Sequence, residues 1–259
     1  LILSQAFILY YTATRGAILG FLGAIFLVAL LLALFDSGRK RMFGGVAMAV
    51  LIIFALLFLG IKDSRFVRSS PVLSRFAGIS LTEQTTESRF LIWNMSYQGF
   101  KENPILGWGQ ENYNVVFNKY YNPKLWKQES WFDRAHNIFF DWLVAAGLLG
   151  LISYLSLFGV AIYLLWVKAR TKLSVLDKSL FTAVLAGYFF HNIFVFDNLT
   201  SYLVFLFILS YISFITDTPK EKKLDARKIV GLGHDLGVSL ILVGTLVSLY
   251  FVNVKPIMA

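Results

Sequence analysis

Residues 42–61, MFGGVAMAVLIIFALLFLGI, contain no charged side chain. A helix needs about 20 residues to cross a hydrocarbon core of about 30 Å. The stretch therefore predicts a membrane-spanning helix, and it decides between a membrane fold and a soluble one.

Further apolar runs lie on both sides of this stretch. We expect an all-α fold, a polytopic membrane helix bundle of about six full spans plus one partial span, with a large extracytoplasmic loop that contains short helices. Residues 1–13 are apolar but too short to span. We interpret them as the end of a helix whose beginning is missing, so the sequence is expected to be a fragment. The other full spans are expected at 16–35, 142–167, 179–196, 198–216 and 236–254.

The composition supports a membrane protein. Hydrophobic residues make up 57% of the 259 residues, charged residues only 15%, and the mean hydropathy is +0.66. Soluble domains contain about 25% charged residues. There is no cysteine, which excludes a disulfide framework and a thiolate metal site.

The net charge of +9 is distributed in a way that indicates topology rather than nucleic-acid binding. Half of the Lys and Arg residues lie in the short loops 36–41, 168–178 and 217–228. Positively charged loops stay in the cytoplasm. This predicts a multi-pass protein of the cytoplasmic membrane with its large loop outside, divided into spans (1–61), the loop (62–136) and further spans (137–259).

The large loop is rich in aromatic residues, which argues against disorder. Residues 85–102 predict an amphipathic helix, because Phe90, Trp93, Tyr97 and Phe100 recur at spacings of three and four. The following NPILGWG (103–109) contains Pro and Gly and ends it. We expect two or more short helices that fold back on the membrane surface.

Several sites are not supported by the sequence. There is no G-x-x-x-x-G-K-[ST] phosphate loop and no outer D-x-D pair for a metal-bound nucleotide sugar. The histidines at 136, 191 and 234 do not have the spacing of metal ligands. We therefore expect neither a metal nor another cofactor.

Cationic and titratable residues gather at the outer membrane face instead. Arg15, in TATRGA, lies at a depth where an arginine is costly without an anionic partner. If Asp133 caps the helix from 137, His136 lies in its first turn, where the helix dipole keeps it neutral, as a general base requires. Asp141, one turn further on, would orient it or pair with an arginine.

These residues also have a simpler interpretation. A single His or Arg at an interface is usually only solvated or snorkelling. Asp141 is as well explained by a structural role. Trp93 and Trp108 fit an interfacial aromatic belt as well as a platform for sugars.

The order of the motifs is more specific than any one of them. TATRGA precedes a span, ESRFLIW and NPILGWGQENY follow in the loop, and RAHNIFFDWLVAAGLLGL leads into the next span. This order, over most of residues 10–155, resembles the O-antigen ligase and O-antigen polymerase superfamily of membrane glycosyltransferases. The later FFHNIFVFDNLTS is similar to members that continue into a helical-repeat domain.

The resemblance implies a reaction. Such enzymes move a glycan from a polyprenyl-diphosphate lipid to an acceptor hydroxyl on a second glycan, on lipid A core or on a protein, without a divalent metal. It also implies roles, with Arg15 and Arg89 binding the diphosphate and His136 acting on the acceptor hydroxyl. We add Arg134 as a further diphosphate-binding candidate and His191 as a more peripheral one.

Three alternatives stay open. The protein is a protein O-oligosaccharyltransferase of the same superfamily, a lipid or polysaccharide transporter, or a membrane anchor for a C-terminal repeat domain. A transporter is expected to have internal repeats with paired broken helices, and none is evident in the sequence. The enzyme interpretation requires Arg15, Arg89 and His136 to face one outer cavity.

Overall fold

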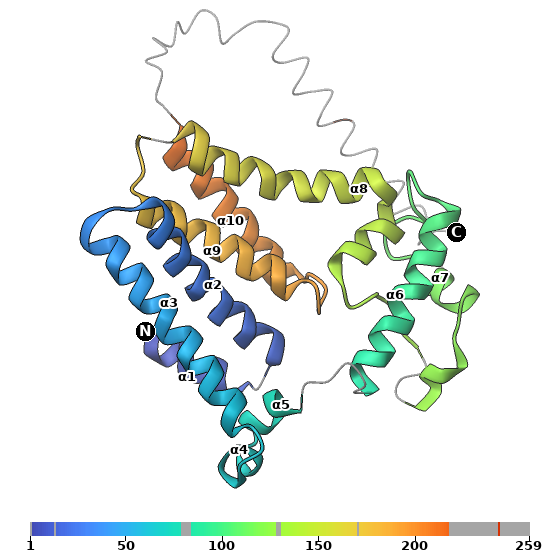
Figure 1. Ribbon diagram of the computed structural model, residues 1–259. Helices are drawn as coiled ribbons and strands as arrows, with labels where there is room; N and C mark the ends of the chain where they lie inside the picture. Colours follow the sequence, from blue (N-terminus) through green and yellow to red (C-terminus); the bar gives the residue numbers. More distant parts are fainter. Residues whose placement is uncertain are drawn as a thin grey trace, which may run out of the picture. The chain divides into compact units, whose positions relative to one another are not determined.

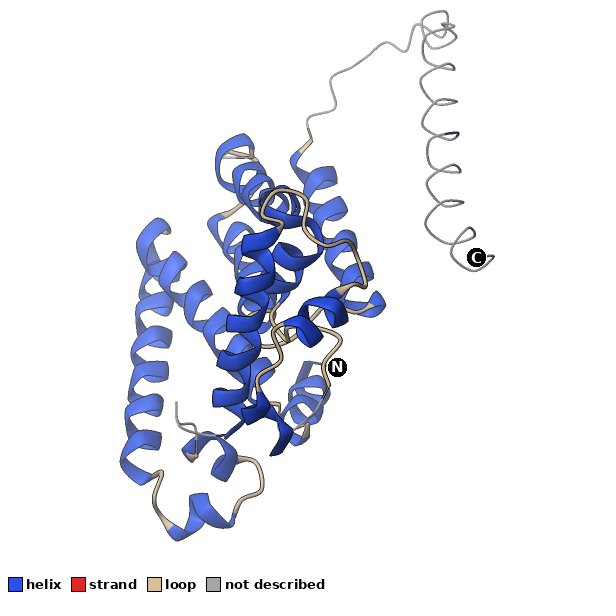
Figure 2. Cartoon of the chain, turned by 90° about the vertical axis from the view of Figure 1, so that its right-hand side faces the viewer, coloured by secondary structure: helices blue, strands red, loops and turns tan. Residues whose placement is uncertain are grey.

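The computed structural model describes residues 2–12, 14–78, 84–127, 131–169, 171–217 and 243. The regular secondary structure of these residues is helical, with no strand among them (Figures 1 and 2). The helices discussed below belong to one compact unit, residues 1–216. They are α1 (Ile2–Tyr11), α2 (Arg15–Phe35), α3 (Gly38–Ile61), α4 (Arg65–Ser69), α5 (Leu73–Ala77), α6 (Gln84–Glu102), α7 (Tyr113–Lys119), the 3₁₀ turn η1 (Pro123–Lys127), α8 (Ile138–Tyr163), the π-helical turn η2 (Leu164–Lys168), α9 (Val175–His191) and α10 (Leu199–Thr216).

Four helices in the described part of the chain are long and apolar enough to cross a membrane: α2, α3, α8 with η2, and α10. The chain is therefore a multi-pass membrane protein with an all-α fold. Helix α9 has 17 residues and ends at His191, short of the expected end at 196. The expected last span, 236–254, lies outside the described residues except for residue 243.

Helix α2 packs between α3 and α9. A Cβ atom on Gly20 would lie 3.2 Å from the Gly187 carbonyl oxygen, and one on Gly44 would lie 2.6 Å from the Ala29 carbonyl oxygen. Small residues thus let these helices approach closely, as is common in membranes. Since Gly16 lies near His191 and Gly20 near Gly187, α2 and α9 run antiparallel.

The packing places the basic loops consistently. The rings of Phe35 and Trp166 lie 5.2 Å apart, so the end of α2 lies beside η2. The residues that directly follow these two elements, 36–37 and 169, therefore share one end of the bundle, and residues 38–41 of the expected basic loop form the start of α3. Arg15 and His191 lie at the opposite end, which agrees with the expected topology.

The expected span 142–167 is not one continuous helix. At Gly147 the backbone has φ 62° and ψ −156°, a conformation that essentially only glycine adopts. Residues 104–109 take over the hydrogen bonds that the break leaves open: Trp108 N–H donates to the Val144 carbonyl at 2.7 Å, and Leu148 N–H to the Pro104 carbonyl at 2.8 Å. Irregular backbone needs such partners near a membrane.

The large loop folds around a hydrophobic core of its own, which we call the outer-loop core. It contains no residue of α2 or α3, but it includes Val144 from the first segment of α8. Its buried members are Ile92, Met95, Tyr113, Val116, Phe117, Leu125, Phe132, Ala135 and Val144.

Helix α6 forms as expected, but its buried face differs from the predicted one. Ile92 and Met95 are buried, whereas the side chains of Phe90 and Tyr97 are each 48% exposed. The reason is the packing of α7 on α6, where Gly99 lies against Val116. The face of α6 that contacts α7 is therefore offset by one residue from the face that carries the four aromatic residues. Short-range spacing alone does not contain that information.

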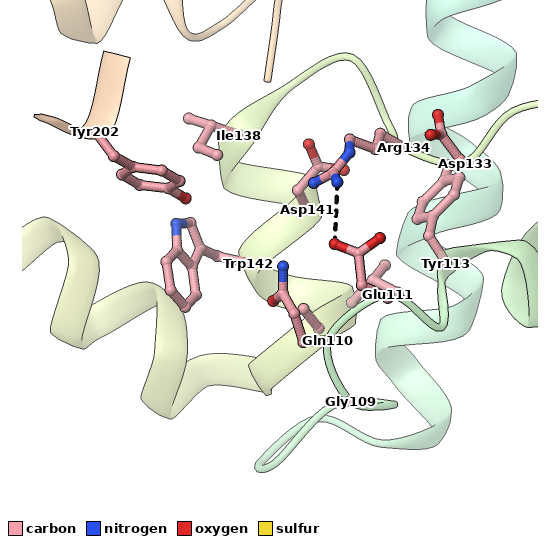
Figure 3. Close-up of a pocket in the computed structure, with 12 residues that line it drawn as sticks. Gly109, Gln110, Glu111, Tyr113, Asp133, Arg134, Ile138, Asp141, Trp142 and Tyr202 are labelled. Atoms are coloured by element: carbon pink, nitrogen blue, oxygen red, sulfur yellow. Dashed lines mark hydrogen bonds and ion pairs between the residues drawn. The ribbon is translucent and has the colours of Figure 1, made fainter. Parts of the chain in front are cut away.

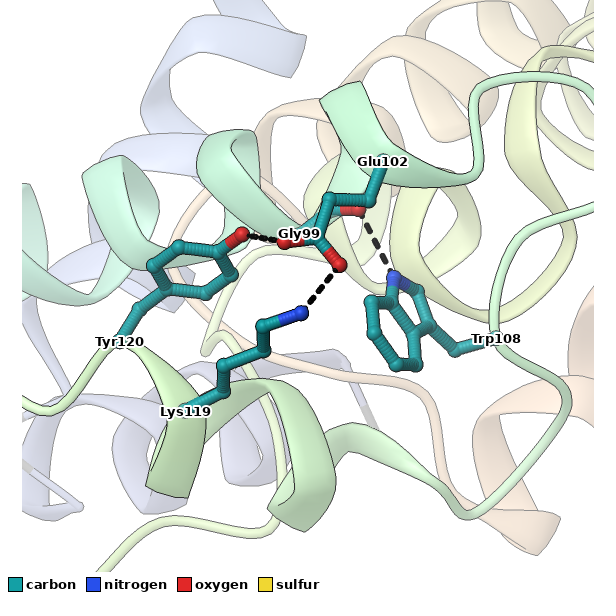
Figure 4. Close-up of polar contacts among 5 residues, drawn as sticks. All are labelled: Gly99, Glu102, Trp108, Lys119 and Tyr120. Atoms are coloured by element: carbon teal, nitrogen blue, oxygen red, sulfur yellow. Dashed lines mark hydrogen bonds and ion pairs between the residues drawn. The ribbon is translucent and has the colours of Figure 1, made fainter.

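Polar contacts fasten α6 to α7 (Figure 4). Glu102 pairs with Lys119 at 2.6 Å and also accepts a hydrogen bond from Tyr120. The Trp108 indole N–H donates to the Gly99 carbonyl at 2.8 Å. These contacts hold the segment that bridges the break in α8.

Candidate active site

The loop at residues 192–198, between α9 and α10, organises the candidate site; we call it the α9–α10 loop. A buried polar network connects this loop to α8, α9 and α10. The buried Asp197 carboxylate accepts hydrogen bonds from Tyr188 and, at 2.8 Å, from Ser201. The Asn192 amide donates to the Tyr154 hydroxyl at 3.0 Å, and the Asn192 carbonyl accepts from Ile138 N–H at 3.0 Å.

Phe194 of this loop meets the first group of predicted residues. The guanidinium carbon of Arg89 lies 5.6 Å from the centre of the Phe194 ring, within the range of a cation–π contact. A Cβ atom on Gly16, next to Arg15, would lie 3.8 Å from both the Phe194 ring and His191 Nδ1. The start of α2, the end of α9 and α6 thus converge at one ring.

Phe196, two residues later, meets the second group. The guanidinium carbon of Arg134 lies 5.3 Å from its ring centre. The His136 ring packs edge-on against it, with centres 5.3 Å apart, and makes a similar contact with Phe132. Arg134 is also paired with Glu111 at 3.0 Å.

The segment that carries His136 is held at both backbone polar groups of Ala135, its N–H and its carbonyl. Asp141 Oδ1 accepts a hydrogen bond from Ala135 N–H at 2.6 Å. The Trp93 indole N–H donates to the Ala135 carbonyl at 3.1 Å, and its ring stacks on Phe140. The residue before His136 is therefore clamped from α6 and from α8.

The predicted cap of α8 was wrong. Asn137, not Asp133, caps the helix, and its side chain accepts from Phe139 N–H at 2.9 Å. His136 precedes the cap and has φ 51°, in the left-handed region. It therefore lies outside the first helical turn, and the helix dipole argument for a neutral imidazole does not apply in the expected form.

The two predicted tryptophans use their N–H groups within the protein. Trp93 holds Ala135 and Trp108 holds Gly99, so both have structural contacts. Asp141 has the structural role described above, and His191 joins the Phe194 group rather than the His136 group.

Sequence reasoning missed the residues that connect the site. Phe194, Phe196, Asp197 and Glu111 were not among the candidates. The signal was present in FFHNIFVFDNLTS, where aromatic and polar residues alternate at the expected end of a span, but only His191 was taken from it.

No group of three or more His, Cys, Asp or Glu residues in the described part of the chain is arranged to hold a metal ion. The cationic groups are arginines, whose planar guanidinium groups bind phosphate oxygens in pairs. In the outer-loop core, burial raises the pKa of Tyr113, so this phenol stays neutral and serves as a hydrogen-bond partner of Ser96.

Comparison with known protein families matches residues 1–155 to the family described as O-Antigen ligase. The chain belongs to the O-antigen ligase family. The resemblance noted in the motifs is thereby confirmed, and membership implies an enzyme that uses lipid-linked glycans. Comparison with curated proteins finds no match.

The match to the family covers only part of the candidate site. Arg15, Arg89, Arg134 and His136 lie inside the region that defines the O-antigen ligase family. The α9–α10 loop lies beyond residue 155, and it contacts three of these side chains and Gly16, the neighbour of Arg15.

Proposed function

We propose that the protein transfers a glycan from a polyprenyl-diphosphate lipid to an acceptor hydroxyl at the outer face of the cytoplasmic membrane. The observation that carries the proposal is the convergence on the α9–α10 loop. Arg89 and the start of α2 meet Phe194, and Arg134 and His136 meet Phe196. Family membership supports the lipid-linked donor.

The proposed donor site is the Phe194 side. In the transfer, the acceptor oxygen forms a bond to the anomeric carbon of the donor sugar. The bond from that carbon to the phosphate oxygen breaks, and its electron pair leaves with the polyprenyl diphosphate. Arg15 and Arg89 would stabilise the growing negative charge by paired hydrogen bonds, so no metal ion is needed for that purpose.

The proposed base is His136. An imidazole nitrogen would accept the proton of the attacking hydroxyl. Positioned proton transfer of this kind contributes about 10²- to 10⁴-fold to a rate. The clamp on Ala135 supports this role, because a general base must be held within hydrogen-bond reach of its substrate.

The test uses the full-length protein in a bacterial host that lacks its own ligase and polymerase and is supplied with a defined undecaprenyl-diphosphate glycan. Arg89→Ala and His136→Ala are compared with wild type at equal membrane abundance, by gel shift and mass spectrometry of the product. We expect each to lower transfer by at least about 100-fold. Arg68→Ala is the matched control, because the Arg68 side chain is 69% exposed and pairs with the similarly exposed Asp63, far along the chain from both groups of site residues.

The outcomes separate the alternatives. Product mass identifies a glycan, lipid A core or protein acceptor. Wild-type rates in both variants would contradict the assigned roles. Lipid movement across the membrane without any product would favour the transporter instead.

A further inference from the structure

A small cavity lies beside the His136 segment, and Arg134 of the Phe196 group is among the residues that line it (Figure 3). Its volume is about 40 Å³. It is bounded by the loop 109–113, by residues 133–134, by the first segment of α8 and by Tyr202 of α10. A water-sized group occupies about 10–15 Å³ on this measure, so the cavity holds about three such groups.

The charges around the cavity do not suit a phosphate. Glu111, Asp133 and Asp141 contribute three carboxylates, and Arg134 contributes one guanidinium that is already paired with Glu111 at 3.0 Å. The local balance is negative, and a diphosphate would be repelled. Neutral hydroxyl groups, which donate hydrogen bonds to carboxylates, are the fitting ligands.

Two polar atoms at the cavity residues have no hydrogen-bond partner among the described residues. They are a donor, Trp142 Nε1, and an acceptor, Asp141 Oδ2. A buried donor or acceptor is costly to leave unpaired. A hydroxyl group both donates and accepts, so ligand hydroxyls complement this pair. In Figure 3 the Trp142 indole nitrogen is turned toward the Tyr202 hydroxyl.

The backbone around the cavity is strained on both sides. Glu111 has φ 63° and His136 has φ 51°, and they are the only non-glycine residues with positive φ in the described part of the chain. Such conformations cluster at functional sites. The Arg134 side chain links them, since it pairs with Glu111 and lies over the Phe196 ring that also contacts His136.

We propose that this cavity binds the acceptor, and that it does so through vicinal hydroxyls at one edge of a sugar ring. This inference rests on the proposed function. The cavity has room for the polar edge of a pyranose and not for a whole glycan, so the rest of the acceptor lies outside. Several hydrogen-bonding groups are matched by a sugar, whereas a Ser or Thr acceptor offers one hydroxyl.

The test measures initial rates of transfer by the full-length protein in lipid nanodiscs. Tyr202→Phe removes the hydroxyl and keeps the ring, and Trp142→Phe removes the indole N–H and leaves a smaller aromatic ring in its place. Acceptor concentration is varied at saturating donor, and donor concentration at saturating acceptor. Tyr211→Phe is the matched control, because it removes a hydroxyl from the same helix at a side chain that is 45% exposed. The acceptor is the soluble core oligosaccharide of the host lipopolysaccharide, or the repeat-unit oligosaccharide if that is what wild type extends.

We expect each cavity variant to raise the KM for the acceptor about 3- to 10-fold, the effect of one lost hydrogen bond. The KM for the donor should stay within twofold of wild type. The rate at which water slowly hydrolyses the donor should also stay within twofold. An unchanged acceptor KM, a change confined to the donor KM, or transfer to Ser and Thr peptides alone overturns the proposal while the transferase function stands. A wild-type protein that transfers nothing overturns both.

Discussion

Helix α3 runs without interruption from Gly38 to Ile61, whereas α8 is broken at Gly147. Both are apolar, both contain glycine, and the sequence predicts each as a simple span. In α3, Gly44 brings two helices together, with the Ala29 carbonyl 2.6 Å from the Cβ position. In α8, Gly147 admits a second chain segment, with the Ile105 carbonyl 2.4 Å from the Cβ position.

The unbroken helix α3 and the broken helix α8 differ in their contribution to the candidate active site. The unbroken helix contributes packing in the membrane and none of the residues of the candidate active site. The broken helix joins the outer-loop core through Val144 and carries Asp141 and Trp142 in its first segment. A break in a span is thus the device by which the loop and the bundle form one site.

Replacement of the glycine at the break should have the largest effect. Gly147→Ala places a Cβ in a backbone region reserved for glycine and within 2.7 Å of three backbone atoms of Pro104 and Ile105. We expect a loss of at least about 3 kcal/mol in the free energy of unfolding. Thermal unfolding of the purified protein, followed by tryptophan fluorescence, measures it.

Gly159→Ala in the same helix is the control. Its Cβ would meet nothing within 4 Å, so stability should stay within about 1 kcal/mol of wild type. Equal melting temperatures for the two variants would mean that α8 is not broken at residue 147.

The second prediction concerns the unbroken helix. Gly44→Ala sets a Cβ 2.6 Å from the Ala29 carbonyl and 2.8 Å from Ala33 N, so α2 and α3 must separate. Overpacking of this kind costs about 1–3 kcal/mol. Thermal unfolding should report that loss, while kcat and both KM values of the protein that remains folded stay near wild type.

Its neighbour provides the comparison. A Cβ on Gly45 would have no atom within 4 Å, and Gly45→Ala should be close to neutral. Loss of activity in folded Gly44→Ala protein would show that the α2–α3 packing contributes to the site after all.

The third prediction tests the two rings of the α9–α10 loop. Phe194→Leu and Phe196→Leu remove the cation–π contacts of Arg89 and Arg134, worth about 1–2 kcal/mol each when partly dry. We expect about a tenfold loss in kcat/KM for each, with Phe194→Leu raising the donor KM and Phe196→Leu lowering kcat.

Tyrosine at either position keeps the ring and should restore most of the activity. Phe214→Leu on α10, where the side chain is 79% exposed, should change nothing. If the Tyr variants are as slow as the Leu variants, the rings fill space and do not position the arginines.

Some of this structure could be predicted because it depends on local sequence. The expected spans 16–35, 42–61 and 198–216 match α2, α3 and α10 closely, since the transfer of a helix into lipid depends on its own side chains. The helix at 85–102 was likewise predicted from its periodicity. Arg15, Arg89 and His136 were selected from motif order, and Arg134 was added from its place beside His136.

The rest depends on contacts between distant residues. The break at Gly147 is set by Pro104 and Ile105, and the buried face of α6 is set by Val116. The cap of α8 by Asn137 rather than Asp133 follows from the Ala135–Asp141 hydrogen bond, which holds residues 133–136 outside the helix. None of these partners is visible in the spacing of the residues they control.

The smallest predicted effect concerns one hydrogen bond of the clamp beside His136. Trp93→Phe removes the N–H that donates to the Ala135 carbonyl and leaves a smaller aromatic ring beside Phe140. A lost hydrogen bond of this kind costs about 1 kcal/mol of stability. Because the accepting carbonyl immediately precedes His136, kcat should also fall about threefold to fivefold, with the donor KM unchanged.

Trp166→Phe is the matched control for that variant. It removes an indole N–H that donates to the Thr182 hydroxyl at 2.9 Å, at the opposite end of the bundle. Both variants should lose similar stability, but only Trp93→Phe should slow transfer. Equal transfer rates in the two variants would mean that the Trp93–Ala135 hydrogen bond stabilises the outer loop without positioning His136. The break in α8 would then be a structural feature with no effect on the rate of transfer.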